Sequence, residues 1–285
     1  MRGIDSEAMK RVAVVGLLLW AGCGVIPGRR SALTARPAGS APAATAPAAA
    51  PAEPERRSLY VGSFDERDAA LELATSHGFA ELTLYGLGAA LRNQQEALAT
   101  FLETAHARGL DVVAPISAMD RVEDLTRWER EHPNARFTGW VTEFEFWNAP
   151  PAERAARFAE LQQILTAMRA QKGDGWIACY LGYPTAEEGA WIAEHVDRVY
   201  LSFAIADPAD AMSWGEGTRS HRARHGYFAG RLPIWPIVYA RGDAHMRPWL
   251  QQHSVSELET TLRRNLNGQM HGVGYFDFAS MRDVF

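Results

Sequence analysis

Two glutamates, Glu143 and Glu145, lie two residues apart in an otherwise apolar stretch. Its aromatic and β-branched residues predict a β-strand over Phe137–Trp147, which Asn148 and two prolines bring to an end. Side chains alternate along a strand, so both carboxylates are expected on one face. Two carboxylates this close in an apolar setting resist joint ionisation, so one should hold a proton near neutral pH, as a general acid does. The structural alternative is a pair neutralised by arginines or open to solvent.

The rest of the chain from Ser58 predicts a framework that would position this pair. Short apolar runs alternate with helical patterns, and eight of the runs are candidate strands: Leu59–Phe64, Glu81–Leu87, Asp111–Ser117, Phe137–Trp147, Trp176–Tyr183, Arg198–Ile205, Ile234–Tyr239 and Val273–Phe278. Eight β–α repeats without a Rossmann glycine fingerprint predict an α/β fold, a (β/α)8 TIM barrel over residues 58–285. A doubly wound open sheet is the alternative.

Working residues of such barrels lie at the carboxyl ends of the strands. Aromatic and hydrogen-bonding side chains gather at the predicted ends, and the candidate substrate-binding residues are Trp147, Tyr180, Tyr239, Asp277, Tyr85 and Ser202. Aromatic faces beside carboxylates and hydroxyls suit sugar rings, so an oligo- or polysaccharide is the predicted partner. No metal cluster and no phosphate loop is seen in the sequence, so no metal and no cofactor is expected. His221 and His225 have metal-ligand spacing, but arginines surround them and we interpret them as part of a solvated helix face.

Order and motifs of the strands resemble the family-18 glycoside hydrolases, the chitinase-like barrels. Their fourth strand ends in Asp-x-x-Asp-x-Asp-x-Glu, and on this motif Glu145 takes the position of the general acid and Glu143 that of the last aspartate. The resemblance implies that Glu145 donates the proton, and that Glu143 raises the pKa of Glu145 and holds the reacting group. The two earlier aspartates of the motif are replaced by Thr138 and Val141, and the sixth strand lacks the family's tyrosine and aspartate.

A different carboxylate partner for Glu145 is also conceivable from the residues alone. Asp277 or Asp243 could face it across the barrel mouth. The separation of the two carboxylates would then distinguish retaining from inverting hydrolysis.

The N-terminal segment has the features of a signal peptide over residues 1–23: basic residues, then an apolar run too short to span a bilayer. Leu19–Cys23 resembles the lipobox of bacterial lipoproteins, which implies lipidation of Cys23. An ordinary secretory signal or a buried segment is the alternative. Residues 24–57 are dominated by Ala, Pro, Ser, Thr and Gly and predict a disordered tether. The expected location is the bacterial cell envelope, with the protein lipid-anchored to the outer membrane or cell surface.

Composition permits one large globular domain: 47% of the 285 residues are hydrophobic and 22% are charged. The net charge of -5 gives no reason to expect nucleic acid. We expect a monomer. The first hypothesis is an envelope-anchored glycoside hydrolase with Glu145 as general acid. The alternatives are a glycan-binding barrel that has lost catalysis and an interaction scaffold without a ligand.

Overall fold

The computed structural model describes residues 56–173, 175–242 and 245–285. The predicted signal peptide with Cys23, almost all of the predicted tether and Asp243 lie outside these described residues. Within them, no helix is long and apolar enough to cross a membrane.

Eight parallel strands close into a barrel in chain order, with β1 paired to both β2 and β8. The strands are β1 Arg57–Val61, β2 Glu81–Leu84, β3 Asp111–Ile116, β4 Gly139–Thr142, β5 Trp176–Leu181, β6 Arg198–Phe203, β7 Ile234–Tyr239 and β8 Val273–Phe276. Each overlaps one predicted strand, and the predicted (β/α)8 TIM barrel is confirmed. The carboxyl ends of parallel strands meet at one mouth, which is why side chains distant in sequence can form one site.

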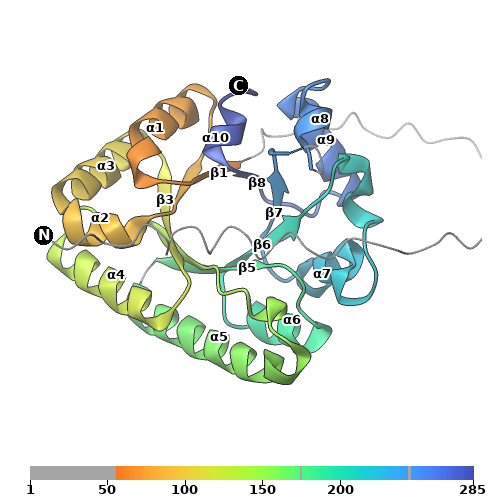
Figure 1. Cartoon of the computed structure of the whole chain (residues 1–285), viewed down its shortest axis with the longest axis horizontal. Helices are drawn as coiled ribbons and strands as arrows, with labels where there is room; N and C mark the ends of the chain where they lie inside the picture. The colour runs from red at the N-terminus through yellow and green to blue at the C-terminus, as the bar shows by residue number, and fades with distance from the viewer. Residues whose placement is uncertain (1–55, 174, 243–244) are drawn as a thin grey trace, which may run out of the picture. The chain divides into compact units, whose positions relative to one another are not determined.

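Helices ring the barrel, as Figure 1 shows. They are α1 Arg67–Ser76, α2 Leu87–Asn93, α3 Gln95–Ala107, α4 Met119–Glu131, α5 Pro151–Lys172, α6 Ala186–Ala193, α7 His221–Phe228, α8 Arg247–Leu250, α9 Val255–Asn265 and α10 Phe278–Met281. Short 3-10 turns are η2 Phe64–Glu66, η3 Phe146–Asn148, η4 Pro208–Met212 and η5 Gly217–Arg219. Residues with known preferences mark the beginning of several α-helices. Thr185 and Ser254 form capping boxes at α6 and α9, and Pro151 is the first residue of α5.

Two apolar layers hold the barrel. Outward strand residues pack against the helices in one large buried cluster. Inward residues form a second, smaller cluster that fills the barrel interior: Tyr60, Val113, Val141, Ala178, Tyr200, Trp235 and Ile237. The barrel interior is thus a packed core.

The fourth strand is much shorter than predicted. It ends at Thr142, and the amide of Glu143 makes the last bond to the β3 ladder by donating to the carbonyl of Ile116 at 2.8 Å. Glu145 then has φ -78 and ψ 59, and the amide of Phe146 donates to the carbonyl of Phe144 at 2.9 Å, which together form an inverse γ-turn. The prediction that side chains alternate continuously to Trp147 was therefore wrong, because the alternation of an extended strand does not continue through a turn.

Candidate active site

Two predicted glutamates and three predicted tyrosines, together with a fourth tyrosine, line one cavity of about 190 Å³ at the barrel mouth, called here the central cavity. Its lining residues come from the ends of six strands or from the segments that follow them: Tyr60, Tyr85, Glu143, Glu145, Tyr180, Ile237, Tyr239, Arg241 and Phe276. Tyr85 was among the predicted residues, whereas Tyr60, Arg241 and Phe276 were not. A period-2 pattern marks Tyr60 only as an inward-facing strand residue, so no local signal indicated its place at the mouth.

Glu143 is the deeper of the two carboxyl groups. The hydroxyl of Tyr85 donates to its Oε2, while its Oε1 is buried and has no hydrogen-bond partner among the described residues. Burial raises the pKa of Glu143 to about 8; the Tyr85 hydrogen bond opposes this shift, and the neighbouring Glu145 adds to it. At neutral pH the group is therefore mostly protonated.

Glu145 sits at the tip of the γ-turn and is exposed. The side-chain amide of Asn148 donates to its Oε2 at 2.7 Å. Partial burial raises the pKa of Glu145, and the bond from Asn148 works against that shift. The two glutamates thus line the same cavity in different environments, which separates their protonation behaviour.

Hydroxyl groups from the strands β5, β6 and β7 form a short chain at the cavity. The hydroxyl of Tyr239 lies 2.9 Å from that of Tyr180 and 3.0 Å from Oγ of Ser202. Burial raises the pKa of both tyrosines, so at neutral pH they are neutral hydroxyls that can donate and accept. Ser202 supports the chain without lining the cavity itself.

Trp147 and Asp277 do not line the central cavity. Trp147 is 7% exposed and packs edge-on against Tyr180 with 5.5 Å between ring centroids, and Gly182 leaves room for its indole. Asp277 caps α10, where its Oδ1 accepts from the amide of Ser280 at 3.1 Å and from its hydroxyl at 2.8 Å. Asp277 also lies 3.7 Å from Arg241. Their contribution to ligand binding stays a prediction.

A second cavity of about 190 Å³ adjoins the first, because Tyr85 and Glu143 line both. It is called here the Arg121 pocket, and its lining residues are Tyr85, Gly86, Leu87, Gly88, Pro115, Ser117, Arg121 and Glu143. Arg121 was not predicted as a site residue. In sequence it reads as one more charged residue of an amphipathic helix, and only the fold brings it beside Glu143.

The interpretation of α7 as a solvated face was wrong. His221, Arg224 and His225 are all buried, while Arg222 on the other side of the helix is exposed. The ring nitrogens of His221 and His225 contact the carbonyls of Ala211 and Gln269.

Arg224 joins the ends of β5 and β6. Its Nη1 donates to the carbonyls of Gly182 and Ser202. No group of three or more potential metal ligands occurs among the described residues, and these histidines act through backbone contacts.

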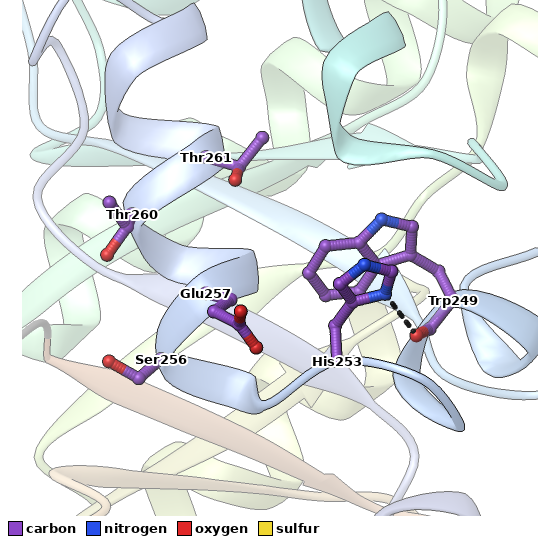
Figure 2. A pocket seen from close by; sticks show the side chains of 6 residues that line it. All are labelled: Trp249, His253, Ser256, Glu257, Thr260 and Thr261. Carbon is purple, nitrogen blue, oxygen red and sulfur yellow. Dashed lines mark hydrogen bonds between the residues drawn. The ribbon is translucent and has the colours of Figure 1, made fainter.

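Another hollow lies on the outer helices α8 and α9 (Figure 2). Its lining residues are Trp249, His253, Ser256, Glu257, Thr260 and Thr261. Figure 2 shows the ring of His253 over that of Trp249, with a hydrogen bond to the tryptophan carbonyl. Glu257 is engaged in the capping box of α9, so its carboxylate already has partners.

Comparison with known proteins supports the fold and no closer relationship. No protein-family model and no curated protein matches the chain. A β-glucuronidase 2 from Bacteroides uniformis, solved with a covalently bound cyclophellitol-6-carboxylate aziridine, matches with TM-score 0.51 and 9% identity, over 79% of this chain and 30% of that one. A candidate fructose-1,6-biphosphate aldolase from Coccidioides immitis matches with TM-score 0.50 and 10% identity, over 78% and 73%.

A chitinase from Ipomoea carnea has TM-score 0.48 and 11% identity, over 80% of this chain and 97% of that chain. The chain spans less than a third of the glucuronidase. Glycosidases, aldolases and other enzymes share this barrel. Structural similarity at such low sequence identity therefore establishes the TIM-barrel fold, and the activity has to be argued from the residues of the site.

Proposed function

We propose that the protein hydrolyses glycosidic bonds of a glycan at the central cavity. One observation carries the proposal: Glu143, whose pKa burial raises to about 8, lines the same cavity as the more exposed Glu145. A buried acid beside a second, more exposed carboxyl group is the arrangement that acid–base glycoside hydrolysis requires.

We assign the proton to Glu143 and not to Glu145, because Glu143 is the more deeply buried of the two. In the proposed step Glu143 protonates the glycosidic oxygen as the bond to the anomeric carbon breaks. Water then adds to that carbon and loses its proton to a carboxylate of the pair. Tyr180, Tyr239 and Tyr85 would orient sugar hydroxyls, since neutral phenols both donate and accept.

We further propose that the barrel acts in the bacterial cell envelope, anchored through lipidated Cys23 and held off the membrane by residues 24–57. Composition and the lipobox-like sequence support this location. Metabolic labelling with a fatty acid that carries a click handle tests it: label should appear on the wild type and be absent from Cys23→Ala.

Hydrolysis is tested with the full chain and a panel of oligosaccharides that includes chitin and peptidoglycan fragments. Products are read by mass spectrometry for the wild type, Glu143→Gln and Glu145→Gln. We expect Glu143→Gln to lower turnover by about 10²–10⁴-fold, because it keeps the shape but cannot release a proton. Full activity in Glu143→Gln with loss only in Glu145→Gln would return the acid role to Glu145. Binding without cleavage by the wild type would favour a glycan-binding protein.

A further inference from the structure

The Arg121 pocket contains a cation whose position is costly. Arg121 lies in the first turn of α4, where the helix dipole favours negative charge, and the cap residue Ala118 makes no side-chain hydrogen bond. A positive charge there opposes the exposed amides of the turn. This placement is unfavourable for the helix unless an anion binds beside it.

Neighbouring acids do not fully neutralise Arg121. Its guanidinium lies 3.4 Å from Asp124, and Arg127 lies 3.5 Å from the same carboxylate. Two cations therefore share one anion. Glu143, the carboxyl group that lines the pocket, is mostly protonated at neutral pH. Asp120 is exposed in the same turn but is not among the lining residues.

Gly88 is what allows the guanidinium to occupy this place. A Cβ built on Gly88 would stand 2.5 Å from Nη2 of Arg121 and 3.3 Å from its Cζ. Gly88 lies inside α2 without a positive φ, so its backbone does not require glycine. The absence of a side chain thus serves the close approach of Arg121 to the wall of the pocket.

From this arrangement we infer that the Arg121 pocket binds a carboxylate carried by the sugar next to the bond that is cleaved. The inference rests on the proposed function, since it takes a glycan as the ligand. A guanidinium matches a planar carboxylate through two parallel hydrogen bonds, with Ser117 and Tyr85 as further polar neighbours. Arg121 is the one cationic side chain among the residues that line this pocket, so it balances one carboxylate, whereas a phosphate dianion carries a second negative charge. The substrate class is therefore an acidic glycan that contains a uronic acid or a lactyl-substituted amino sugar.

The test compares glycans that differ by the carboxylate. The full chain is assayed with a chitin tetrasaccharide, with the stem-free peptidoglycan tetrasaccharide of the same linkage, whose alternate sugars carry lactyl groups, and with a hyaluronan tetrasaccharide. We expect a carboxylated substrate to exceed chitin in kcat/KM by about tenfold or more. A preference for the hyaluronan tetrasaccharide would identify a uronic acid as the source of the carboxylate, and a preference for the peptidoglycan tetrasaccharide would identify the lactyl group.

Three variants separate this subsite from general effects. Arg121→Gln should abolish the preference for the carboxylated substrate over chitin. Gly88→Ala keeps Arg121 but displaces its guanidinium, and should lose the preference in a folded protein because alanine suits a helix better than glycine. Arg127→Gln removes the other arginine at Asp124, outside the pocket, and should keep the preference. Equal cleavage of neutral and acidic glycans, or an unchanged preference in Arg121→Gln, would overturn the inference and leave hydrolysis standing.

A binding measurement tests the subsite without turnover. N-acetylmuramic acid and N-acetylglucosamine differ by the lactyl group, and glucuronic acid and glucose differ by the carboxylate. Each is titrated into the wild type and Arg121→Gln and followed by NMR. If no oligosaccharide is cleaved, the hydrolytic proposal fails, and tighter binding of either acidic sugar that Arg121→Gln removes still supports the subsite. Equal binding of both members of both pairs would reject it.

Discussion

At the scale of single residues, Glu143 shows how position decides chemistry. Glu145, two residues away, has the same side chain but lies exposed at a turn, with Asn148 as a partner. Glu143 is held at the end of the β4 ladder, with one carboxyl oxygen hydrogen-bonded to Tyr85 and the other without a partner in the described part of the chain. Burial disfavours its charged form, and this is why the proton stays on Glu143.

This difference predicts the pH dependence of stability. The pKa of Glu143 rises from 4.5 to about 8, so between these pH values the folded protein retains a proton that the unfolded chain has released. The free energy of unfolding of the wild type should therefore fall as pH rises through this range. Glu143→Gln cannot ionise, so relative to the wild type it should gain about 1 kcal/mol or more between pH 5 and pH 9.

Urea unfolding at both pH values measures the effect, with the exposed Glu145→Gln as a control in which the gain should be smaller. Parallel pH profiles for the wild type and Glu143→Gln would contradict the protonated state of Glu143.

At the scale of elements, a tryptophan followed four residues later by a histidine ends three helices. The stacked pairs are Trp128 with His132, Trp191 with His195, and Trp249 with His253, with ring centroids 3.7, 3.7 and 4.1 Å apart. In each pair Nδ1 of the histidine lies 2.7–3.2 Å from the tryptophan carbonyl. Figure 2 shows the third. A backbone amide also donates to each of these carbonyls, so the histidine ring adds a side-chain contact at the helix end and stacks on the indole.

The pair at α6 provides the prediction at this scale. His195→Ala removes the Nδ1 hydrogen bond and the stacking on Trp191, and should lower the free energy of unfolding by about 1–2 kcal/mol. His195→Phe keeps an aromatic ring without the donor and should lose less. Urea denaturation of the three proteins measures this order. An unchanged midpoint in His195→Ala would show that the contact adds nothing to stability.

At the scale of the whole molecule, a buried polar cluster joins opposite walls of the barrel. Glu81 of β2 accepts from the hydroxyl of Tyr200 at 2.6 Å and from Arg198 at 3.0 Å, and both partners belong to β6. Trp176 and Trp235 flank the guanidinium, 3.7 and 5.4 Å from their ring centroids. Burial raises the pKa of Glu81, while Arg198 and Tyr200 favour its charged form.

Breaking this cluster from one side should affect the entire fold. Arg198→Met leaves the Glu81 carboxylate buried beside a single hydroxyl, and we expect a loss of about 3–5 kcal/mol. Glu81→Gln combined with Arg198→Met removes both charges and should recover a large part of that loss. Thermal and urea unfolding of single and double variants test this. Equal stabilities for Arg198→Met and the double variant would contradict the charge pairing.

Local patterns in the sequence determined the number, order and type of the main elements. Apolar runs and helical periodicity depend on neighbouring residues, so all eight strands were found, and Glu143 and Glu145 were identified as a pair. The same reasoning placed the end of β4 too late, at Trp147. The point at which β4 stops pairing with β3 depends on the tertiary structure, which a local pattern does not contain. The predictions for residues 1–55 are sequence inferences that the described structure does not test.

Only the tertiary structure decided which polar residues face one another. Glu143 is more deeply buried than Glu145. This burial depends on Tyr60, Tyr85 and other residues far away in the chain. The buried state of Arg224 likewise arises from the carbonyls of Gly182 and Ser202, which its own helix does not supply. Arg121 joins the site because Gly88 on another helix leaves room for it. Desolvation and steric fit are sums over contacts distant in sequence, and a local pattern carries no record of them.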